Sequence, residues 1–186
     1  MPDSPAIPQP SAPADPASVH RLLLLLAVGA QLYAIDTETV VEVIPQVLLR
    51  PLSGAPDHLR GVFNFRSRVV PVVDVTQLIA GEACADHLSS RIIMVRHNTS
   101  DGESALLGLL AERVTDTLLK PLASFRPAEG AAAQRPFLGG VALDERGLIQ
   151  LLLCDRLAAA ALTGLDPTDL PDPGLIRSTS GRDGRL

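Results

Sequence analysis

The sequence has very few aromatic residues, and this scarcity limits the partners that the protein can bind. Aromatic residues make up 3% of the 186 positions, and tryptophan is absent. Proteins that bind single-stranded nucleic acid by stacking need exposed aromatic rings, and nucleic-acid binders in general need a basic surface. The formal net charge of this chain is -5. Both features weigh against nucleic acid as a partner.

Cysteine is also scarce. Cys84 and Cys154 are the two cysteines, and the sequence contains no C-x-x-C pair and no neighbouring pair of histidines. Disulfide frameworks and zinc sites both need more ligands at closer spacing. We therefore expect reduced thiols, no metal site and no cofactor.

The sequence lacks the common motifs of catalysis. It has no G-x-S-x-G, no H-E-x-x-H and no glycine-rich phosphate loop. Asp74 and Asp155 each begin a predicted helix, and capping of that helix explains them without catalysis. The four histidines are predicted to lie in loops or near a terminus: His20, His58, His87 and His97. The sequence thus predicts a protein that is not an enzyme.

No hydrophobic run is long enough to cross a membrane. The longest candidate, residues 22–30, follows Arg21 and imitates a signal peptide, but it falls far short of the ~20 residues that a bilayer requires. Residues 1–20 include Asp3 and Asp15 and no Lys or Arg. We expect a buried first strand, a cytoplasmic protein and no direct membrane insertion.

One stretch of the chain is repeated. Residues 61–74 read as a short strand, a polar turn that carries Arg66, and a β-branched strand that ends at an aspartate. The pattern returns 79 positions later, in Gly140 and in the apolar run 148–153. Because repetition of a supersecondary unit indicates a duplicated architecture, the sequence predicts two similar small barrels.

Short apolar runs alternate with turn residues at the spacing of an all-β protein. The predicted strands are 22–28, 31–35, 40–44, 60–65, 69–73, 91–95, 105–110, 114–118, 137–143 and 148–153, and the predicted helices are 75–80 and 155–162. The segment 114–118 repeats the apolar and acidic pattern of 40–44.

The ends of the chain differ from its middle in composition. Residues 1–18 are rich in proline and alanine, and 163–186 are rich in proline, glycine and charge, so we expect both to be mostly disordered. The folded domain should span 19–162. We expect a first barrel at about 19–83 and a second at about 88–162.

Glu42 and Arg66 are charged residues in or beside apolar strands. A partly enclosed charge is costly unless it is paired, so one hypothesis is that the two pair near a barrel surface and orient each other for a partner. The alternative, that Arg66 is only a solvated turn residue, stays open. Pro71 marks an edge strand or a bulge, and an edge is a natural place for docking.

Positive charge gathers in the same region. Four arginines fall within nineteen positions: Arg50, Arg60, Arg66 and Arg68. They form either a solvated face or a docking patch for an acidic protein surface.

Three stretches resemble the CheW family, the coupling proteins of bacterial chemosensory arrays. They are YAID with VVEVI at 33–36 and 40–44, PLSGAPDHLRGVFNFR with VVPVVDV at 51–66 and 69–75, and PFLGGV with LIQLLL at 136–141 and 148–153. The resemblance implies an all-β fold of two packed five-stranded SH3-like β-barrels with a few short helices. It also implies no catalytic activity.

By the same resemblance, the protein would bridge the cytoplasmic tip of a methyl-accepting chemoreceptor to the regulatory domain of a CheA-type histidine kinase. Glu42 and Arg66 match the family's paired acidic and arginine residues, and Asn64 and Phe65 match the turn beside them. The residues expected to bind partners are Glu42, Val43, Asn64, Phe65, Arg66 and Arg68.

The chain departs from the family pattern at Ser67, where the signature usually has glycine. If the turn requires a positive φ, serine adopts it less easily. Together with the two tails and the alanine-rich loop 129–133, this departure suggests a specialised paralogue in an alternative, non-flagellar pathway. Other readings remain: an SH3- or OB-like barrel that binds nucleic acid or another protein, or a chain that binds the receptor without the kinase.

Overall fold

The computed structural model describes residues 19–84, 89–165, 170–172, 174 and 176. The expected tail 1–18 and most of the expected tail 163–186 lie outside these described residues. Within them, neither α-helix has the length and hydrophobicity of a membrane span.

The described residues form nine strands and a few short helices, in close agreement with the predicted all-β class. The strands are β1 (His20–Val28), β2 (Gln31–Asp36), β3 (Val40–Pro45), β4 (Leu59–Phe65), β5 (Arg68–Asp74), β6 (Arg91–Asn98), β7 (Ser104–Pro121), β8 (Leu138–Asp144) and β9 (Gly147–Leu152). The helices are α1 (Val75–Ala80), η2 (Leu122–Ser124), η3 (Gly130–Gln134) and α2 (Cys154–Ala161).

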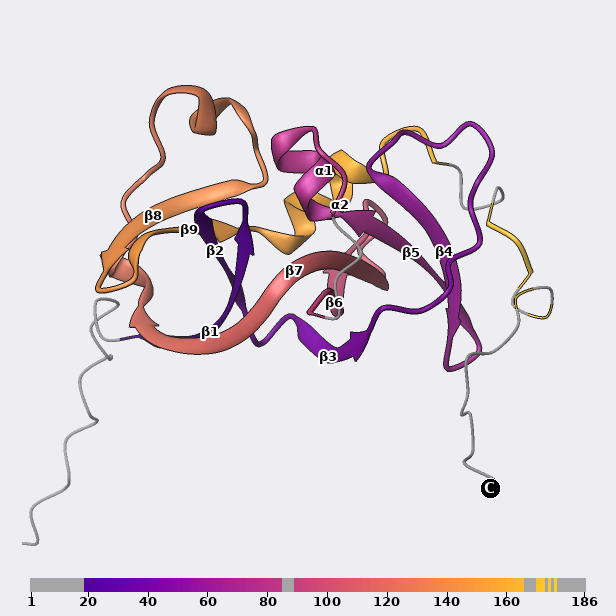
Figure 1. The fold of residues 1–186 in the computed structure, drawn as a ribbon, viewed down its shortest axis with the longest axis horizontal. Helices are drawn as coiled ribbons and strands as arrows, with labels where there is room; N and C mark the ends of the chain where they lie inside the picture. The colour runs from indigo at the N-terminus through magenta and orange to yellow at the C-terminus, as the bar shows by residue number, and fades with distance from the viewer. Residues whose placement is uncertain (1–18, 85–88, 166–169, 173, 175, 177–186) are drawn as a thin grey trace, which may run out of the picture.

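The strands build two five-stranded barrels that share β7 (Figure 1). Barrel A contains β1, β2, β8, β9 and the second part of β7, which pairs with β1. Barrel B contains β3, β4, β5, β6 and the first part of β7, which pairs with β5 and β6. Two neighbouring strand pairs are parallel, β2 with β9 and β5 with β7, and all the others are antiparallel.

The barrels do not follow the halves of the sequence. The expected division into 19–83 and 88–162 differs from the observed pairing, because β1 and β2 pair with the late strands β7 and β9. After β2 the chain crosses to barrel B, where β3 pairs with β6. The second part of β7 makes the reciprocal crossing to barrel A. The first half of the chain therefore supplies β1 and β2 to barrel A, and the second half supplies β6 and the first part of β7 to barrel B.

The prediction of two strands at 105–110 and 114–118 is wrong, because β7 runs through both without a break. The residues between them, Ala111, Glu112 and Arg113, include no glycine or proline to end a strand. Arg113 adopts a φ of 45°, and the pairing with β1 shifts register between Leu25 and Ala27. A bulge of this kind bends a strand and increases its twist, which lets β7 pass from one barrel to the other.

The predicted repeat is confirmed as two hairpins that are each followed by a helix: β4–β5–α1 and β8–β9–α2. An incoming segment also crosses each hairpin at the same place, through the bridges Arg50–Val62 and Arg126–Val141. The residue before each bridged valine must be glycine, because a side chain there would collide with the backbone of the crossing segment. A Cβ on Gly61 would lie 2.3 Å from the carbonyl oxygen of Arg50, and one on Gly140 would lie 2.8 Å from that of Arg126.

The two predicted helix caps have different outcomes. The Asp74 carboxylate accepts a hydrogen bond from the Gln77 backbone N–H at 3.0 Å, so Asp74 caps α1 as predicted, and Gly81 ends this helix. Asp155 is not a cap, because α2 begins one residue earlier and its N-cap is Leu153. The Asp155 carboxylate instead accepts from the backbone N–H of Asn98 at 2.8 Å, and so ties α2 to the end of β6.

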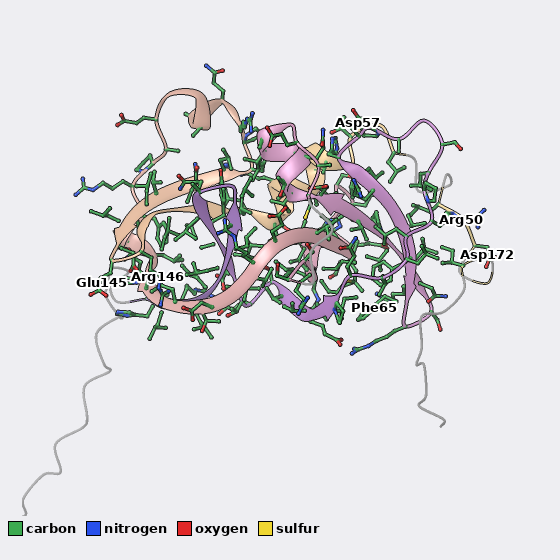
Figure 2. The ribbon with its side chains drawn as sticks, viewed as in Figure 1. Arg50, Asp57, Phe65, Glu145, Arg146 and Asp172 are labelled. Carbon is green, nitrogen blue, oxygen red and sulfur yellow. The ribbon has the colours of Figure 1, made fainter. Side chains whose placement is uncertain are left out.

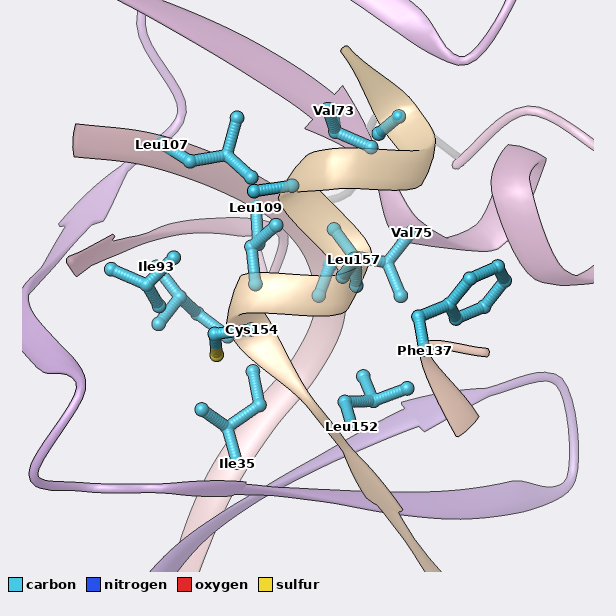
Figure 3. Packing of buried hydrophobic residues seen from close by; sticks show 14 of the residues in the cluster. Ile35, Val73, Val75, Ile93, Leu107, Leu109, Phe137, Leu152, Cys154 and Leu157 are labelled. Atoms are coloured by element: carbon cyan, nitrogen blue, oxygen red, sulfur yellow. The ribbon is translucent and has the colours of Figure 1, made fainter. Parts of the chain in front are cut away.

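The main hydrophobic cluster lies between the barrels and around α2 (Figure 3). Leu157 of α2 is fully buried against Ile35 of barrel A and against Val73 and Leu109 of barrel B. Smaller clusters fill the interior of each barrel. Because each barrel uses its outer face to cover the other, the two pack as one body.

The structure tests two sequence expectations about single residues. His97 is not a solvated loop residue: it is 6% exposed and lies in β6. Pro71 is expected to mark an edge strand or a bulge. It is not on an edge, because β5 pairs with β4 on one side and with β7 on the other, but the β4–β5 pairing shifts register opposite Val72 and Val73, directly after Pro71. Pro71 precedes Val72, where the parallel pairing with β7 begins, so the missing N–H falls just outside that ladder.

Candidate docking site

Glu42 and Arg66 form the predicted ion pair. The Arg66 Nη2 atom donates to the Glu42 Oε2 atom at 2.7 Å, and this contact joins β3 to the turn between β4 and β5. The expectation that both charges are partly enclosed is wrong for the arginine, whose side chain is 71% exposed. Exposed ion pairs typically contribute ~1 kcal/mol or less to stability. The contact therefore fixes geometry at the surface more than it stabilises the fold.

The turn that carries Arg66 is a two-residue hairpin turn with an unusual backbone. Arg66 has φ 50° and Ser67 has φ 63°, and the flanking residues Phe65 and Arg68 are cross-strand partners. Positive φ at both central residues is the requirement of a type I′ turn. The Asn64 side chain supports it by accepting a hydrogen bond from the Ser67 N–H at 3.0 Å. This hydrogen bond to Asn64 therefore helps to hold the turn in its conformation.

Phe65 makes a second contact with the Arg66 side chain. The Arg66 guanidinium carbon lies 4.9 Å from the centroid of the Phe65 ring, within the range of a cation–π contact. Phe65 in turn packs at a tilt against Phe63, with ring centroids 6.2 Å apart, and joins the cluster inside barrel B. Arg66 is therefore placed by a carboxylate and by an aromatic ring, while most of its surface stays open to solvent.

The other predicted site residues are not all brought to this turn. Arg68 is exposed at the start of β5, directly after the turn. Val43 is 39% exposed, but it follows Glu42 in β3, and successive side chains of a strand point to opposite faces. Val43 therefore lies on the other face of β3 from the ion pair.

The expected four-arginine patch is divided in the structure. Arg60 lies 3.9 Å from the buried carboxylate of Asp74, whereas Arg66 is bound to Glu42. Arg50 contributes the backbone bridge to Val62 that crosses the first hairpin. Arg66 and Arg68 are left as the positive charges at the turn.

Sequence reasoning missed Leu48. Its side chain is 89% exposed, more than any other large hydrophobic residue that the structure describes. Its neighbours Val47 and Leu49 pack against the same cluster as Phe65, which places the segment beside the hairpin. The signal in the sequence is three apolar residues in a row after the end of a strand, of which only two can face the core. We define the hairpin face as Glu42, Leu48, Phe65, Arg66 and Arg68.

Barrel A has an equivalent of the ion pair. The Arg146 guanidinium lies 3.0 Å from the Asp116 carboxylate, and Asp116 occupies the position in β7 that Glu42 occupies in β3. Arg146 lies in the turn between β8 and β9. The predicted similarity of 114–118 to 40–44 thus has a structural meaning: both segments are the crossing strands. The labels of Phe65 and Arg146 in Figure 2 show that the two turns lie at opposite ends of the molecule.

The described residues offer little for acid–base or thiol chemistry. Burial raises the pKa of the Cys84 and Cys154 thiols to about 11, so neither is a reactive thiolate at neutral pH. A hollow of about 620 Å³ lies between residues 50–56 and the segment after α2, and Arg50 is its single ionisable lining residue. No group of three or more potential metal ligands occurs within the described ranges.

The protein consists of two SH3-like barrels that share a strand, with an exposed ion pair and two buried, unreactive thiols. These features are those of a binding scaffold. Comparison with known proteins identifies the family. The family model described as CheW-like domain matches residues 22–161, and the chain belongs to this family. Its members are non-enzymatic scaffold proteins of chemotaxis.

Individual relatives agree with this assignment. The chain is 28% identical to "Chemotaxis protein CheW" of Rhizobium meliloti (strain 1021) over 139 residues, which cover 74% of this chain and 86% of the relative. It is 26% identical to "Chemotaxis protein CheW" of Klebsiella aerogenes over 71% of this chain and 78% of that protein. The fold is similar to that of the scaffolding protein TtCheW from Thermoanaerobacter tengcongensis, with a TM-score of 0.65, 21% identity, and coverage of 75% of this chain and 88% of that one.

Proposed function

We propose that this scaffold couples a chemoreceptor to a CheA-type histidine kinase, and that the hairpin face is its docking site. The partners are the cytoplasmic tip of a methyl-accepting chemoreceptor and the regulatory domain of the kinase, and the protein acts in the cytoplasm. The observation that carries the proposal is the exposed Glu42–Arg66 pair on a turn with positive φ at both central residues.

Two physical arguments support a docking role for this turn. Backbone held in the left-handed region by residues other than glycine costs on the order of 1–3 kcal/mol for each residue, and such strain is concentrated at functional sites. An arginine that is already positioned loses less side-chain freedom when it binds an acidic partner. Phe65 supplies apolar surface directly beside the charge, and arginine is one of the residue types enriched in binding hot spots.

Asn64 and Val43 have different parts in this proposal. Asn64 acts by shaping the turn through the Ser67 N–H. Val43, on the opposite face of β3, would contact a partner only if that partner reaches around the strand.

The pathway is a finer proposal. We infer an alternative, non-flagellar pathway from Ser67, which stands at φ 63° where the family signature usually has glycine. A reshaped turn would favour a partner set of its own. A pull-down with the kinases and receptors of several pathways tests this, and preferential binding to the flagellar set would contradict it.

Calorimetric titration of the full chain with the regulatory domain of its cognate kinase tests the docking site. We expect micromolar binding that Arg66→Ala weakens by about tenfold or more, which corresponds to at least ~1.4 kcal/mol. Arg96→Ala is the matched control, since Arg96 is an exposed arginine of β6 in the same barrel. Equal affinity of the wild-type chain and both variants would remove the hairpin face from the interface.

A further inference from the structure

A small hollow on barrel A combines apolar and charged lining residues. It has a volume of about 170 Å³ and lies where β1 turns into β2, beside the bulge of β7. Its apolar floor is formed by Leu25, Leu26, Ala27 and Leu32, and its charged rim by Arg113, Asp116 and Arg146. At ~30 Å³ for each water molecule, the volume suits a ligand of about six non-hydrogen atoms. We call this site the barrel A hollow.

The bulge in β7 holds Arg113 at the hollow. Arg113 has φ 45°, and the pairing of β7 with β1 shifts register beside it. Bulges re-aim side chains next to functional sites, and left-handed backbone at residues other than glycine is concentrated at such sites. The Arg113 Nη2 atom donates to the carbonyl oxygen of Gly29, in the turn between β1 and β2. The guanidinium group is therefore fixed at the edge of the hollow.

The contacts that fix Arg113 do not neutralise its charge. Gly29 offers a neutral carbonyl group, and Arg113 forms no ion pair with any residue that the structure describes. The carboxylate of the preceding residue, Glu112, accepts a hydrogen bond from the Cys84 thiol, which belongs to the cluster inside barrel B. A guanidinium group has five N–H donors, and the bond to Gly29 uses one of its nitrogens. Arg113 therefore keeps its charge and several donors for a ligand.

Arg146 provides a second positioned guanidinium group. It stands on the turn between β8 and β9, at the end of barrel A (Figure 2). Its Nη2 atom lies 3.0 Å from the Asp116 carboxylate, and its side chain is 43% exposed. The Asp116 Oδ1 atom also accepts a hydrogen bond from the Thr117 N–H at 2.8 Å, so both oxygens of this carboxylate are engaged. Two arginines and one aspartate leave a formal charge of +1 on the rim.

We propose that the barrel A hollow binds one carboxylate on a short alkyl stem. The carboxylate oxygens accept hydrogen bonds from Arg113 and Arg146, and the stem packs against the apolar floor. Charge-assisted bonds between arginine and a carboxylate are among the strongest hydrogen bonds in proteins, and they orient the ligand. A phosphate or sulfate ion fits less well, because it has no apolar part to cover the floor and loses more hydration on entering.

Two kinds of molecule carry this chemistry: the glutamate side chain of another protein, and a free short-chain acid. Each has about the six non-hydrogen atoms for which the hollow has room. The inference does not depend on the proposed coupling role, since neither a receptor nor a kinase is needed to fill the hollow.

Titration of the full chain with sodium butyrate, followed by NMR, tests the proposal. We expect saturable shifts of the side-chain Nε–H signals of Arg113 and Arg146 and of the methyl signals of Leu32. The Kd should be about 1–10 mM, because so few atoms limit the affinity. Butan-1-ol, a neutral molecule with a similar stem, should bind at least about tenfold more weakly. Equal affinity for butyrate and butan-1-ol, or shifts that sodium chloride reproduces at the same ionic strength, would overturn the proposal.

Substitution of the rim arginines tests which residues bind the carboxylate. Arg113→Ala should weaken butyrate binding by about tenfold or more, because charge-assisted hydrogen bonds are lost. Arg126→Ala is the matched control and should leave the Kd unchanged, since Arg126 is an exposed arginine on the segment that crosses β8 of the same barrel. Arg146→Gln is a second variant, which removes a charge from the rim and leaves the bulge of β7 in place. Unchanged affinity in both R113A and R146Q would refute the site.

A second ligand separates the two sources of the carboxylate. Glutamate blocked as its N-acetyl N-methylamide presents the side chain as it occurs within a protein. Tighter binding of blocked glutamate than of butyrate would support a protein as the source, and tighter binding of butyrate would support a free acid. Lack of saturable binding by both ligands up to ~100 mM would overturn the proposal and leave the docking role of the hairpin face untouched.

Discussion

Arg66 Nη2 donates to Glu42 Oε2 at 2.7 Å across the gap between a strand that has crossed from the other barrel and the hairpin turn that it meets. Glu42 reaches this position because β3 leaves its neighbour β2 and pairs with β6. Arg66 reaches it because the turn adopts left-handed backbone at two consecutive residues. The contact therefore depends both on the pairing of β3 with β6 and on the left-handed backbone of the turn.

Ser67→Gly should stabilise the protein. Serine at φ 63° bears a steric cost that glycine does not. Glycine loses more backbone entropy on folding, which offsets part of the relief, so the free energy of unfolding should rise by a net ~0.5–1 kcal/mol, measured by thermal or urea unfolding. Ser53→Gly is the control, because Ser53 is exposed and is not among the residues with positive φ. Loss of stability in S67G would show that the serine side chain contributes more than the backbone costs.

Gly61→Ala should be among the most damaging single-methyl changes in the chain. The new Cβ would lie 2.3 Å from the Arg50 carbonyl oxygen, and φ is 134°, so the Arg50–Val62 bridge must open. We expect a loss of about 3 kcal/mol or more in unfolding free energy, measured by chemical denaturation.

Gly54→Ala provides the comparison for that change. Gly54 also has a positive φ, at 76°, but a Cβ there meets nothing within 4 Å. Its cost should stay near ~1 kcal/mol, which is the backbone cost alone. Similar losses in G54A and G61A would refute the close approach of the incoming segment.

Alkaline pH should destabilise the fold through the two thiols. Burial raises the pKa of Cys84 and Cys154 from 9.0 to about 11, so the thiols are easier to ionise in the unfolded chain. Their contribution to stability is complete below pH 9 and is lost as the pH rises towards 11. Unfolding midpoints measured between pH 8 and pH 11 should fall.

A Cys84→Ala/Cys154→Ala double variant should show a shallower fall over the same range. The native chain should also react slowly with iodoacetamide and quickly once it is denatured. An unchanged slope in the double variant would mean that other groups cause the alkaline loss.

Local features of the fold could be predicted from the sequence because they depend on short-range chemistry. The hairpins, the Asp74 cap and the glycine at 81 follow from turn and capping preferences that act within a few residues. The pairing of Glu42 with Arg66 was also predicted, although its premise of two enclosed charges is wrong for Arg66, whose side chain is 71% exposed.

The exchange of strands could not be predicted in the same way. Which barrel receives β3 depends on contacts between residues far apart in the sequence, and nothing local distinguishes the two arrangements. The continuity of β7 was missed because the bulge at Arg113 involves no glycine or proline. The exposure of Leu48 depends on which two of three successive apolar residues face the core, and that is decided by tertiary packing.

The central claim is that the Glu42–Arg66 pair contacts a partner rather than serving the fold alone, and a charge swap tests it most directly. The variant E42R/R66E retains an ion pair between the same positions but reverses its polarity. We predict that the swap keeps the thermal midpoint close to that of the wild-type chain and loses calorimetric binding to the kinase regulatory domain, since the charge offered to the partner has changed sign. Full binding by the swapped variant would contradict the account, because the pair would then act only by holding the turn.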